Sequence, residues 1–293
     1  MYPHFEPLGL QHQETVSRLF FEARPDASEL TFTNLFIWRQ HYRFHVSRLD
    51  GCLVVAGRTP GNEPFYLPPV GPGAAAACRR LLAEKTAAGL LARVSEHDLA
   101  RCELRPGEKF RIVEEHDQAD YVYLTDSLIR LAGNRYSAKR NHLRRFKAQY
   151  PWEYQSLEAE MVPDCMRLEE EWCRTRVCPR QLGLEAERVA IWEALENFGR
   201  LAYTGGAILV DGRLEAFTLG GSLNDRCGVI HIEKANPGIE GIYTAINQQY
   251  LAHELAGYEF VNREQDLGDA GLRRSKLSYH PYHFVRKHTV RAI

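Results

Sequence analysis

The chain has 293 residues, a length that fits one large domain or two domains of ordinary size. Lysine and arginine number 37 against 38 for aspartate and glutamate, and 44% of the residues are hydrophobic, so the overall charge indicates no class of partner. The longest apolar runs, such as Ala74 to Cys78, fall far short of the roughly 18 residues that a membrane span needs, and the N-terminus lacks a signal-peptide pattern. We therefore expect a cytoplasmic protein.

Hydrophobic periodicity predicts helices and strands in alternation through the first half of the chain. Helices are expected over residues 12–23, 30–40, 74–88 and in a stretch from 96. Strands are expected at residues 42–49, 52–57, 64–70, 90–94, 110–115 and 120–124.

The second half repeats this order of elements more clearly. Strands are expected at residues 152–157, 201–210, 213–221, 227–235, 258–262 and 283–287, and helices at 163–176, 185–198, 242–256 and 270–279. The pair Asp211-Gly212 is a two-residue hairpin signal, so the strands around it belong to an antiparallel meander. The repeated order predicts an α+β fold of two tandem modules, residues 1–130 and 131–293, with a boundary between 125 and 150.

Cysteine and histidine spacing indicates no metal site. The seven cysteines never form a C-x-x-C pair, which argues against a zinc knuckle and against a disulfide framework. His280, His283 and His288 lie close in sequence, but their spacing matches no helical ligand pair and Pro281 interrupts them. We expect neither a metal nor a tightly bound cofactor.

One segment departs from the balanced charge of the chain. Residues 127–152 contain seven lysines and arginines and no acidic residue. Leu143, Phe146 and Tyr150 recur at helical spacing, so a helix over 137–150 is expected to pack against the core at the boundary between the modules. Its outward face carries Arg140, Arg144 and Lys147. The segment is either a solvated basic helix or a surface that binds the phosphates of tRNA, of a nucleotide or of an anionic head group.

The start of this basic helix is a candidate anion site. Ser137 is a suitable N-cap, and free backbone amides at a helix start favour negative groups. Side chains around that start are expected to bind substrate, namely Arg135, Tyr136, Lys139, Arg140 and Asn141.

The stretch HIEKANPGIEG, residues 231–241, ends a predicted strand. Alternation places His231 and Glu233 on one face, with Ile230, Ile232 and Lys234 on the other. Glu233 is then a candidate general base for an amine or hydroxyl acceptor, or a binding group for a substrate ammonium. The alternative is an ordinary surface pair of glutamate and lysine.

The stretch FVNREQDLGDAGLRRSKLSYHP, residues 260–281, combines a strand end with a highly charged helix. Asp269 is a candidate N-cap, and Leu272, Lys276 and Tyr279 fall on one face of the helix. A lysine on an apolar face needs a partner, because an unpaired buried ammonium is strongly disfavoured.

The partner of Lys276 stays open at this point. Glu264 or Asp266 would make it a structural ion pair, whereas a bound anion would make it part of a site. Asn262 and Arg263 end the strand next to the HIEKA strand, so we expect them to face the same cleft. The interpretation that this stretch lines a site is favoured over a solvated cluster of charges.

Three stretches carry a resemblance to a known family: GNRYSAKRNHLRRFKAQYP at 133–151, HIEKANPGIEGIYTAIN at 231–247, and residues 260–281. They resemble the bacterial family grouped with the C-terminal catalytic domain of phosphatidylglycerol lysyltransferase. The resemblance implies two tandem GNAT-like modules, each a mixed, mostly antiparallel sheet flanked by helices. Family members of known activity move an aminoacyl group from charged tRNA to a lipid head group. The chain contains no stretch like the membrane-spanning portion of those enzymes, which leaves the acceptor open.

The resemblance also implies roles for individual residues. GNAT enzymes often place a tyrosine where Tyr279 falls, as the acid that protonates the leaving group. Their pyrophosphate-binding loop is absent here; Gly238 and Gly241 permit a close backbone approach, but Glu240 opposes a pyrophosphate, which argues against acetyl coenzyme A. The expected catalytic residues are Glu233, Lys276 and Tyr279. Further substrate-binding residues are His231, Lys234, Asn236, Tyr243, Asn262, Arg263 and Asp266.

We therefore expect an acyltransferase that takes an aminoacyl group from aminoacyl-tRNA and gives it to an amine or hydroxyl acceptor, such as a phospholipid head group or a small molecule. In that reaction Lys276 or Arg263 steadies the developing negative charge. One alternative keeps the fold and uses acyl coenzyme A as the donor. Another is a non-catalytic module that binds RNA or an anionic surface. The expected location is cytoplasmic, with a peripheral position at the inner membrane surface as a variant, and the oligomeric state stays open.

Overall fold

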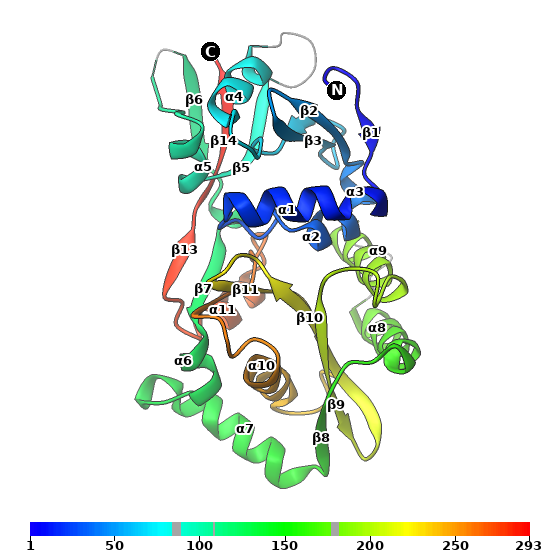
Figure 1. The fold of residues 1–293 in the computed structure, drawn as a ribbon. Helices are drawn as coiled ribbons and strands as arrows, with labels where there is room; N and C mark the ends of the chain where they lie inside the picture. The colour runs from blue at the N-terminus through cyan, green and yellow to red at the C-terminus, as the bar shows by residue number, and fades with distance from the viewer. Residues whose placement is uncertain (84–88, 108, 177–181) are drawn as a thin grey trace.

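The computed structural model describes residues 1–83, 89–107, 109–176 and 182–293. Figure 1 shows an elongated molecule with a mixed sheet toward each end, helix α1 (Gln13–Ala23) between them, and both termini at the end of the first sheet. The fold is α+β, as the sequence predicts, with seven strands in each sheet among the described residues.

Each sheet is mostly antiparallel with one parallel pair. The first has the order β1 (Glu6–Pro7), β2 (His45–Leu49), β3 (Cys52–Arg58), β4 (Pro64–Tyr66), β5 (Leu90–Ser95), β14 (Lys287–Ala292) and β6 (Phe110–Glu114). The second has the order β13 (His283–Val285), β7 (Asp120–Leu124), β12 (Phe260–Asn262), β11 (Cys227–Ala235), β10 (Arg213–Ser222), β9 (Thr204–Val210) and β8 (Trp152–Ser156). The parallel pairs are β4 with β5 and β11 with β12.

The two sheets exchange strands. β7 precedes residue 130 but pairs with β12 and β13 in the second sheet. β14, which ends the described fold, pairs with β5 and β6 in the first sheet. The strands of the two sheets are therefore not separated at the predicted boundary near residue 130. The predicted final strand is also divided, because the chain leaves the second sheet after Val285 and enters the first at Lys287.

Helices cover the sheets and fill the space between them. The remaining α-helices are α2 (Phe32–Ile37), α3 (Arg39–Tyr42), α4 (Ala74–Leu82), α5 (Glu96–Arg101), α6 (Thr125–Arg130), α7 (Ser137–Gln149), α8 (Val162–Arg176), α9 (Leu182–Glu196), α10 (Ile242–His253) and α11 (Ala270–Leu277). Single 3-10 turns lie at Leu10–His12, His116–Gln118, Asn134–Tyr136 and Ala159–Met161. No helix in these described ranges is long and apolar enough to cross a membrane.

Helix boundaries differ most from the sequence prediction at two places; the other predicted boundaries agree within three residues. The helix expected over 30–40 is two short helices, because Trp38 has φ −95° and ψ 0° and ends the first of them. The helix expected to reach residue 88 is described only to Leu82, and 84–88 lie outside the described residues.

One hydrophobic core runs through both modules. It includes Val16 of α1, Leu35 of α2, Ile191 of α9 and Phe217 of β10, all at most 1% exposed. Because α1 and α2 come from the first module and α9 and β10 from the second, burial of this apolar surface holds the modules together.

A buried charge network lies where the chain passes between the sheets. The fully buried ammonium of Lys287 is 2.6 Å from a carboxylate oxygen of Glu29 and 2.6 Å from one of Asp120. Asp120 also accepts hydrogen bonds from the backbone N–H and hydroxyl of Ser28 and from the amide of Asn262. A buried ion pair needs such additional hydrogen bonds to offset the loss of hydration. Lys287 thus links β14 of the first sheet to Glu29 and to β7 of the second sheet.

A β-bulge interrupts β11. Leu219 faces Ile232 and Gly220 faces Ile230, so His231 is an extra residue without a partner on β10. A one-residue insertion reverses which face the following side chains take. Ile230 accordingly packs beside α10, whereas Ile232 packs into the core shared by both modules. The prediction that these two isoleucines share a face is wrong for this reason.

Cysteines in the described ranges are mostly free and buried. Cys52, Cys78, Cys102, Cys165 and Cys227 carry free thiols. Cys173 is disulfide-bonded, which the sequence spacing did not indicate, and Cys178 lies outside the described residues. Within the described part of the chain, no group of three histidine, cysteine or acidic side chains is placed to hold a metal ion.

Candidate active site

The candidate site is built around an ion pair between two neighbouring strands. Glu233 lies near the end of β11, and Arg263 directly follows β12, which pairs with β11 in parallel. Arg263 Nη2 donates to Glu233 Oε1 at 3.0 Å, and Asn247 Nδ2 of α10 donates to Glu233 Oε2 at 2.9 Å. Both side chains of the pair are largely buried, so the pair is poorly screened by water. The carboxylate is held in one orientation from both sides.

Arg263 has one nitrogen left over. Its guanidinium carbon lies 4.8 Å from the ring centre of Tyr279 and 5.8 Å from that of Tyr123. Nη1 is buried and has no hydrogen-bond partner among the described residues. A buried donor without an acceptor is costly, and such groups are uncommon outside functional sites. The described residues thus supply no acceptor for the Nη1 hydrogens of Arg263.

Lys139 of α7 brings a second cation to the same place. Its ammonium lies 3.7 Å from the ring centre of Tyr279 and has no carboxylate at ion-pair distance among the described residues. Burial, and then the nearby charge of Arg263, lower the pKa of Lys139 to about 8. A half-buried lysine with such a pKa exists partly as the neutral amine near neutral pH, so it can accept a proton.

Tyr279 connects these groups to the rest of the fold. It follows α11, is 4% exposed, and its hydroxyl donates to Thr244 Oγ1 of α10 at 3.3 Å. Burial raises the pKa of Tyr279, which keeps the hydroxyl protonated. The backbone oxygen of Tyr279 accepts a hydrogen bond from the hydroxyl of Tyr136 at 3.1 Å, so the start of α7 is fixed against the end of α11.

Together Glu233, Arg263, Tyr279 and Lys139 form what we call the EKRY cluster. They come from four different segments and combine two cations, one carboxylate and one protonated hydroxyl. Such a set can bind a polar carbonyl group, stabilise negative charge on its oxygen and exchange a proton.

The ammonium of Lys276 uses all of its hydrogen-bond donors within the protein. Its ammonium donates to the backbone oxygens of Arg263 at 2.6 Å, Glu264 at 3.1 Å and Gln265 at 2.6 Å. Lysine has three N–H donors, so none remains for a substrate. The expected structural partners, the side chains of Glu264 and Asp266, are not bonded to it; main-chain carbonyls take their place. Lys276 holds the loop that carries Arg263.

Three other predicted residues hold the loop and the module junction. Asp266 accepts hydrogen bonds from Tyr121 and Arg273. Burial alone would raise the pKa of its carboxyl, but these hydrogen bonds outweigh burial and lower the pKa to about 2. Asn262 donates to Asp120 in the buried charge network.

His231 also lies at the junction. Its Nδ1 is 2.7 Å from Glu264 Oε1, and its Nε2 is 3.3 Å from the hydroxyl of Thr31, the N-cap of α2. The same glutamate oxygen accepts a hydrogen bond from Asn34 of α2. The loop after β12 is therefore tied to the first module by polar contacts.

Lys234, Asn236 and Tyr243 lie away from the EKRY cluster. The ammonium of Lys234 is 3.0 Å from Glu187 and 3.5 Å from the ring centre of Trp172, on the side of β11 covered by α8 and α9. Asn236 donates to Glu215 and accepts from the backbone of Gly238, which shapes the turn. Tyr243 donates to the backbone oxygen of Ala235. The structure gives these three side chains local packing partners.

The basic helix α7 lies at the outer end of the molecule (Figure 1). Leu143 and Phe146 are buried against α10, as the sequence predicts. Arg140 donates to the backbone oxygens of Leu131 and Gly133, so this side chain caps the preceding loop. The basic and amide side chains Arg135, Asn141, Arg144, Arg145 and Lys147 are exposed.

Sequence reasoning missed Asn247 and Thr244. Both are buried on α10, at positions three residues apart, within a helix whose other buried residues are mostly apolar. A buried asparagine on an apolar helix face needs a hydrogen-bond partner, and this was the available signal. Lys139 was expected to bind substrate, but its position over Tyr279 was not.

The fold defines the architectural class of the protein. Its two mixed sheets flanked by helices are GNAT-like; FemX, at 10% identity, covers 99% of this chain and 97% of its own with a TM-score of 0.57, which shows a shared fold. A family model described as "Phosphatidylglycerol lysyltransferase, C-terminal" matches residues 21–291. The chain belongs to this family, as its sequence motifs predict.

Solved structures and one curated relative are similar to this chain. A conserved protein of unknown function from Bacteroides thetaiotaomicron is 34% identical over 100% of both chains, with a TM-score of 0.92. L-PGS from Bacillus licheniformis is 14% identical, covers 99% of this chain and 94% of its own, and has a TM-score of 0.65. An uncharacterized protein from Mycoplasmoides gallisepticum is 26% identical over 59% of this chain, and the matched part spans 56% of that protein.

Proposed function

We propose that the protein transfers an aminoacyl group from aminoacyl-tRNA to an amine or hydroxyl acceptor at the EKRY cluster. The observation that carries the proposal is the convergence of the Glu233–Arg263 pair, with its free buried Nη1, on the half-buried amine of Lys139. The family is named for a lysyl transfer to phosphatidylglycerol, which makes an anionic phospholipid head group one candidate acceptor.

The reaction needs one nucleophilic attack and one proton transfer. The acceptor nitrogen or oxygen attacks the ester carbonyl carbon, and its proton passes to the neutral amine of Lys139. Arg263 Nη1 stabilises the negative charge that develops on the carbonyl oxygen. When the bond to the tRNA ribose oxygen breaks, that oxygen receives the proton by way of the Tyr279 hydroxyl, and Lys139 is neutral again.

Glu233 has a different role in this proposal from the one expected. Both of its oxygens already accept hydrogen bonds, from Arg263 and Asn247, so the proposal gives the base to Lys139. Each oxygen keeps a lone pair that can bind the α-ammonium of an aminoacyl group. This fits an aminoacyl donor better than a neutral acyl group, because the latter offers no ammonium.

The start of α10 argues against acyl coenzyme A as the donor. Glu240, just before α10, lies 3.2 Å from Arg145 and 3.3 Å from His142 of α7. Gly241 approaches α7 so closely that a Cβ on it would lie 2.5 Å from the backbone oxygen of His142. The amides that a GNAT enzyme offers to pyrophosphate are thus covered by α7 and faced by a carboxylate.

The test is a transfer assay with radiolabelled aminoacyl-tRNA and two acceptors, phosphatidylglycerol vesicles and a small primary amine. Buffer alone is the control without acceptor. We expect label in one acceptor, and its loss in Arg263→Met and Glu233→Gln. Glu153→Gln, which changes an exposed strand carboxylate in the same sheet, should leave the rate unchanged. Transfer from acyl coenzyme A but not from aminoacyl-tRNA would refute the proposed donor.

A further inference from the structure

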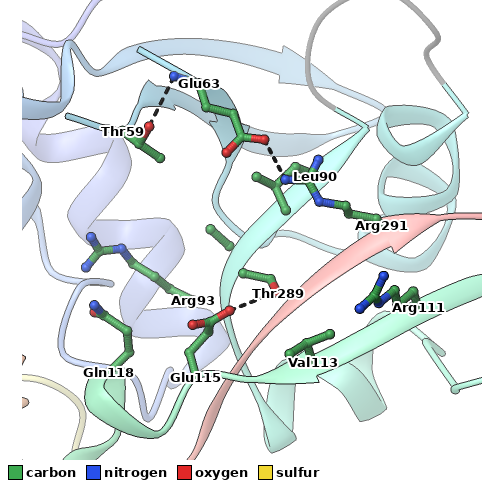
Figure 2. A pocket seen from close by; sticks show the side chains of 11 residues that line it. Thr59, Glu63, Leu90, Arg93, Arg111, Val113, Glu115, Gln118, Thr289 and Arg291 are labelled. Carbon is green, nitrogen blue, oxygen red and sulfur yellow. Dashed lines mark hydrogen bonds and ion pairs between the residues drawn. The ribbon is translucent and has the colours of Figure 1, made fainter. Parts of the chain in front are cut away.

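A hollow over the strands of the first sheet lies apart from the EKRY cluster. It has a volume of about 500 Å³ and is formed by β5, β14 and β6 together with the turn between β3 and β4 (Figure 2). None of the four cluster residues lines it. Its size is in the range of sites for small molecules.

Strand β6 and the residue that follows it carry opposite charges along the hollow. Arg111, Val113 and Glu115 alternate along the chain and all line the hollow. At about 3.3 Å per residue, the backbones of Arg111 and Glu115 lie roughly 13 Å apart. The hollow therefore has a cationic end with Arg111 and Arg291 and an acidic end with Glu115. Arg93 also lines the acidic end, but its guanidinium is paired with Glu29 at 2.9 Å. Val113 of β6 and Ala92 of β5 form the apolar middle.

The cationic end holds two arginines in direct opposition. Arg291 of β14 faces Arg111 of β6 in the strand register. Arg291 is paired with Glu63 at 2.5 Å, whereas Arg111 has no ion-pair partner among the described residues. Like charges directly opposite each other on neighbouring strands destabilise a sheet, so an added carboxylate here is favourable.

The acidic end holds acceptors that lack donors. Glu115 Oε1 accepts a hydrogen bond from Thr289 at 3.1 Å, which leaves its second oxygen available. The side-chain oxygen of Gln118 is buried and has no hydrogen-bond partner in the described part of the chain. Figure 2 shows these two side chains next to each other at the same end of the hollow. A buried acceptor of this kind calls for an N–H donor.

We propose that this hollow binds a small elongated zwitterion. Its ammonium group is held by Glu115 and Gln118, its carboxylate by Arg111, and its alkyl chain lies over Val113 and Ala92. Free ω-amino acids, basic amino acids and short peptides share this pattern of charges. The apolar middle favours an alkyl spacer over a peptide one. Binding in this hollow does not depend on the proposed transfer reaction.

Isothermal titration calorimetry on the full chain tests this site with 6-aminohexanoate and 8-aminooctanoate as probes. Hexanoate and hexylamine each keep one charged end, and triglycine keeps both ends with a polar spacer. We expect at least one ω-amino acid to bind, and each single-ended probe to bind about tenfold more weakly, the ratio for loss of one hydrogen bond to a charged group. Triglycine that bound more tightly than both ω-amino acids would indicate a peptide as the natural ligand and contradict the alkyl spacer.

Variants locate the binding. Arg111→Ala and Glu115→Gln should each weaken binding about tenfold. Arg48→Ala, which removes an exposed arginine from β2 of the same sheet, should not. Val113→Trp changes an exposed strand residue and should block the hollow while leaving the thermal melt unchanged, so it tests the site if Arg111→Ala fails to fold. Absence of heat with both ω-amino acids up to millimolar concentration, or binding that all three variants leave intact, would overturn the proposal.

Discussion

Lys276 and Arg263 are joined through the main chain. The ammonium of Lys276 donates to the backbone oxygen of Arg263 at 2.6 Å, while the side chain of Arg263 donates to Glu233 at 3.0 Å. The same ammonium also donates to the backbone oxygens of Glu264 and Gln265. Glu264, the middle one of these three residues, has a left-handed φ of 57°. The direction in which Arg263 points therefore depends on a lysine that binds the main chain of this loop and not the Arg263 guanidinium.

Lys276→Met should loosen this loop. Three backbone oxygens lose their donor, and we expect the free energy of unfolding to fall by about 3 kcal/mol. Urea unfolding measures it. Arg274→Met, on an exposed position of the same helix, should cost less than about 0.5 kcal/mol. Equal effects of the two substitutions would show that Lys276 does not hold the loop.

Local signals in the sequence located many elements. Asp269 is the N-cap of α11, as predicted, and its side chain accepts from the backbone of Leu272 at 2.6 Å. Asp211 and Gly212 both have positive φ, which the predicted hairpin requires. The pairing of β7 and β14 with the opposite sheets was not predictable, because strand partners distant in sequence leave no local pattern. The bulge at His231 was hidden for the same reason.

The sequence predicted most of the residues of the candidate site, but not how their side chains are arranged. Glu233, Arg263 and Tyr279 were placed on adjoining segments, and the structure brings them together with Lys139. Sequence spacing shows that Lys276 must have a partner but cannot distinguish a carboxylate from three main-chain oxygens. That distinction decides between a residue of the cluster and a residue that holds it in place.

Transfer activity should increase with pH through the titration of Lys139. The pKa of Lys139 is lowered to about 8, and the neutral amine is the form that accepts a proton. The rate should therefore rise as pH rises through 8 and level off above it. Lys139→Arg keeps the charge but stays protonated throughout, so it should lose both the activity and this pH dependence. A pH–rate profile that keeps the same rise in Lys139→Arg would assign the base to another group.

Removal of the buried ammonium at the module junction should be strongly destabilising. Lys287→Met leaves the carboxylate of Asp120 buried without its cation and leaves Glu29 with Arg93 alone, at a cost of about 3–5 kcal/mol. Arg286→Met removes an exposed partner of Glu96 from the adjacent position and should cost about 1 kcal/mol or less. Thermal unfolding compares them. A small effect of Lys287→Met would mean that the network contributes little to the junction.

A matched pair of glycines tests the contact between α7 and α10. Gly241 and Gly212 both have a left-handed φ, 85° and 75°, and Gly212 lies in a two-residue hairpin turn, so alanine adds backbone strain of about 1–2 kcal/mol at both. Only at Gly241 does a Cβ meet another segment, 2.5 Å from the backbone oxygen of His142. Gly241→Ala should therefore be clearly less stable than Gly212→Ala in chemical denaturation, because a Cβ at Gly212 meets no other atom within 4 Å. Equal losses would indicate that α7 moves away without cost.

Charge reversal on α7 should weaken tRNA binding in a salt-dependent way. Arg144 and Lys147 are exposed, whereas Arg140 caps a loop, so the reversal is best made as Arg144→Glu with Lys147→Glu. For every phosphate that is no longer neutralised, the slope of log affinity against log salt should decrease by about 0.7–0.9. Filter binding at several salt concentrations measures the slope.

Arg48→Glu on β2 is the control for this reversal, because it makes an equal change in charge per site far from α7. It should leave the slope unchanged. Arg263→Met should abolish transfer yet keep the affinity for tRNA, since the guanidinium is buried in the cluster. If the α7 reversal left both affinity and slope intact, the basic helix would be a solvated surface, and the donor would have to approach the EKRY cluster from another side.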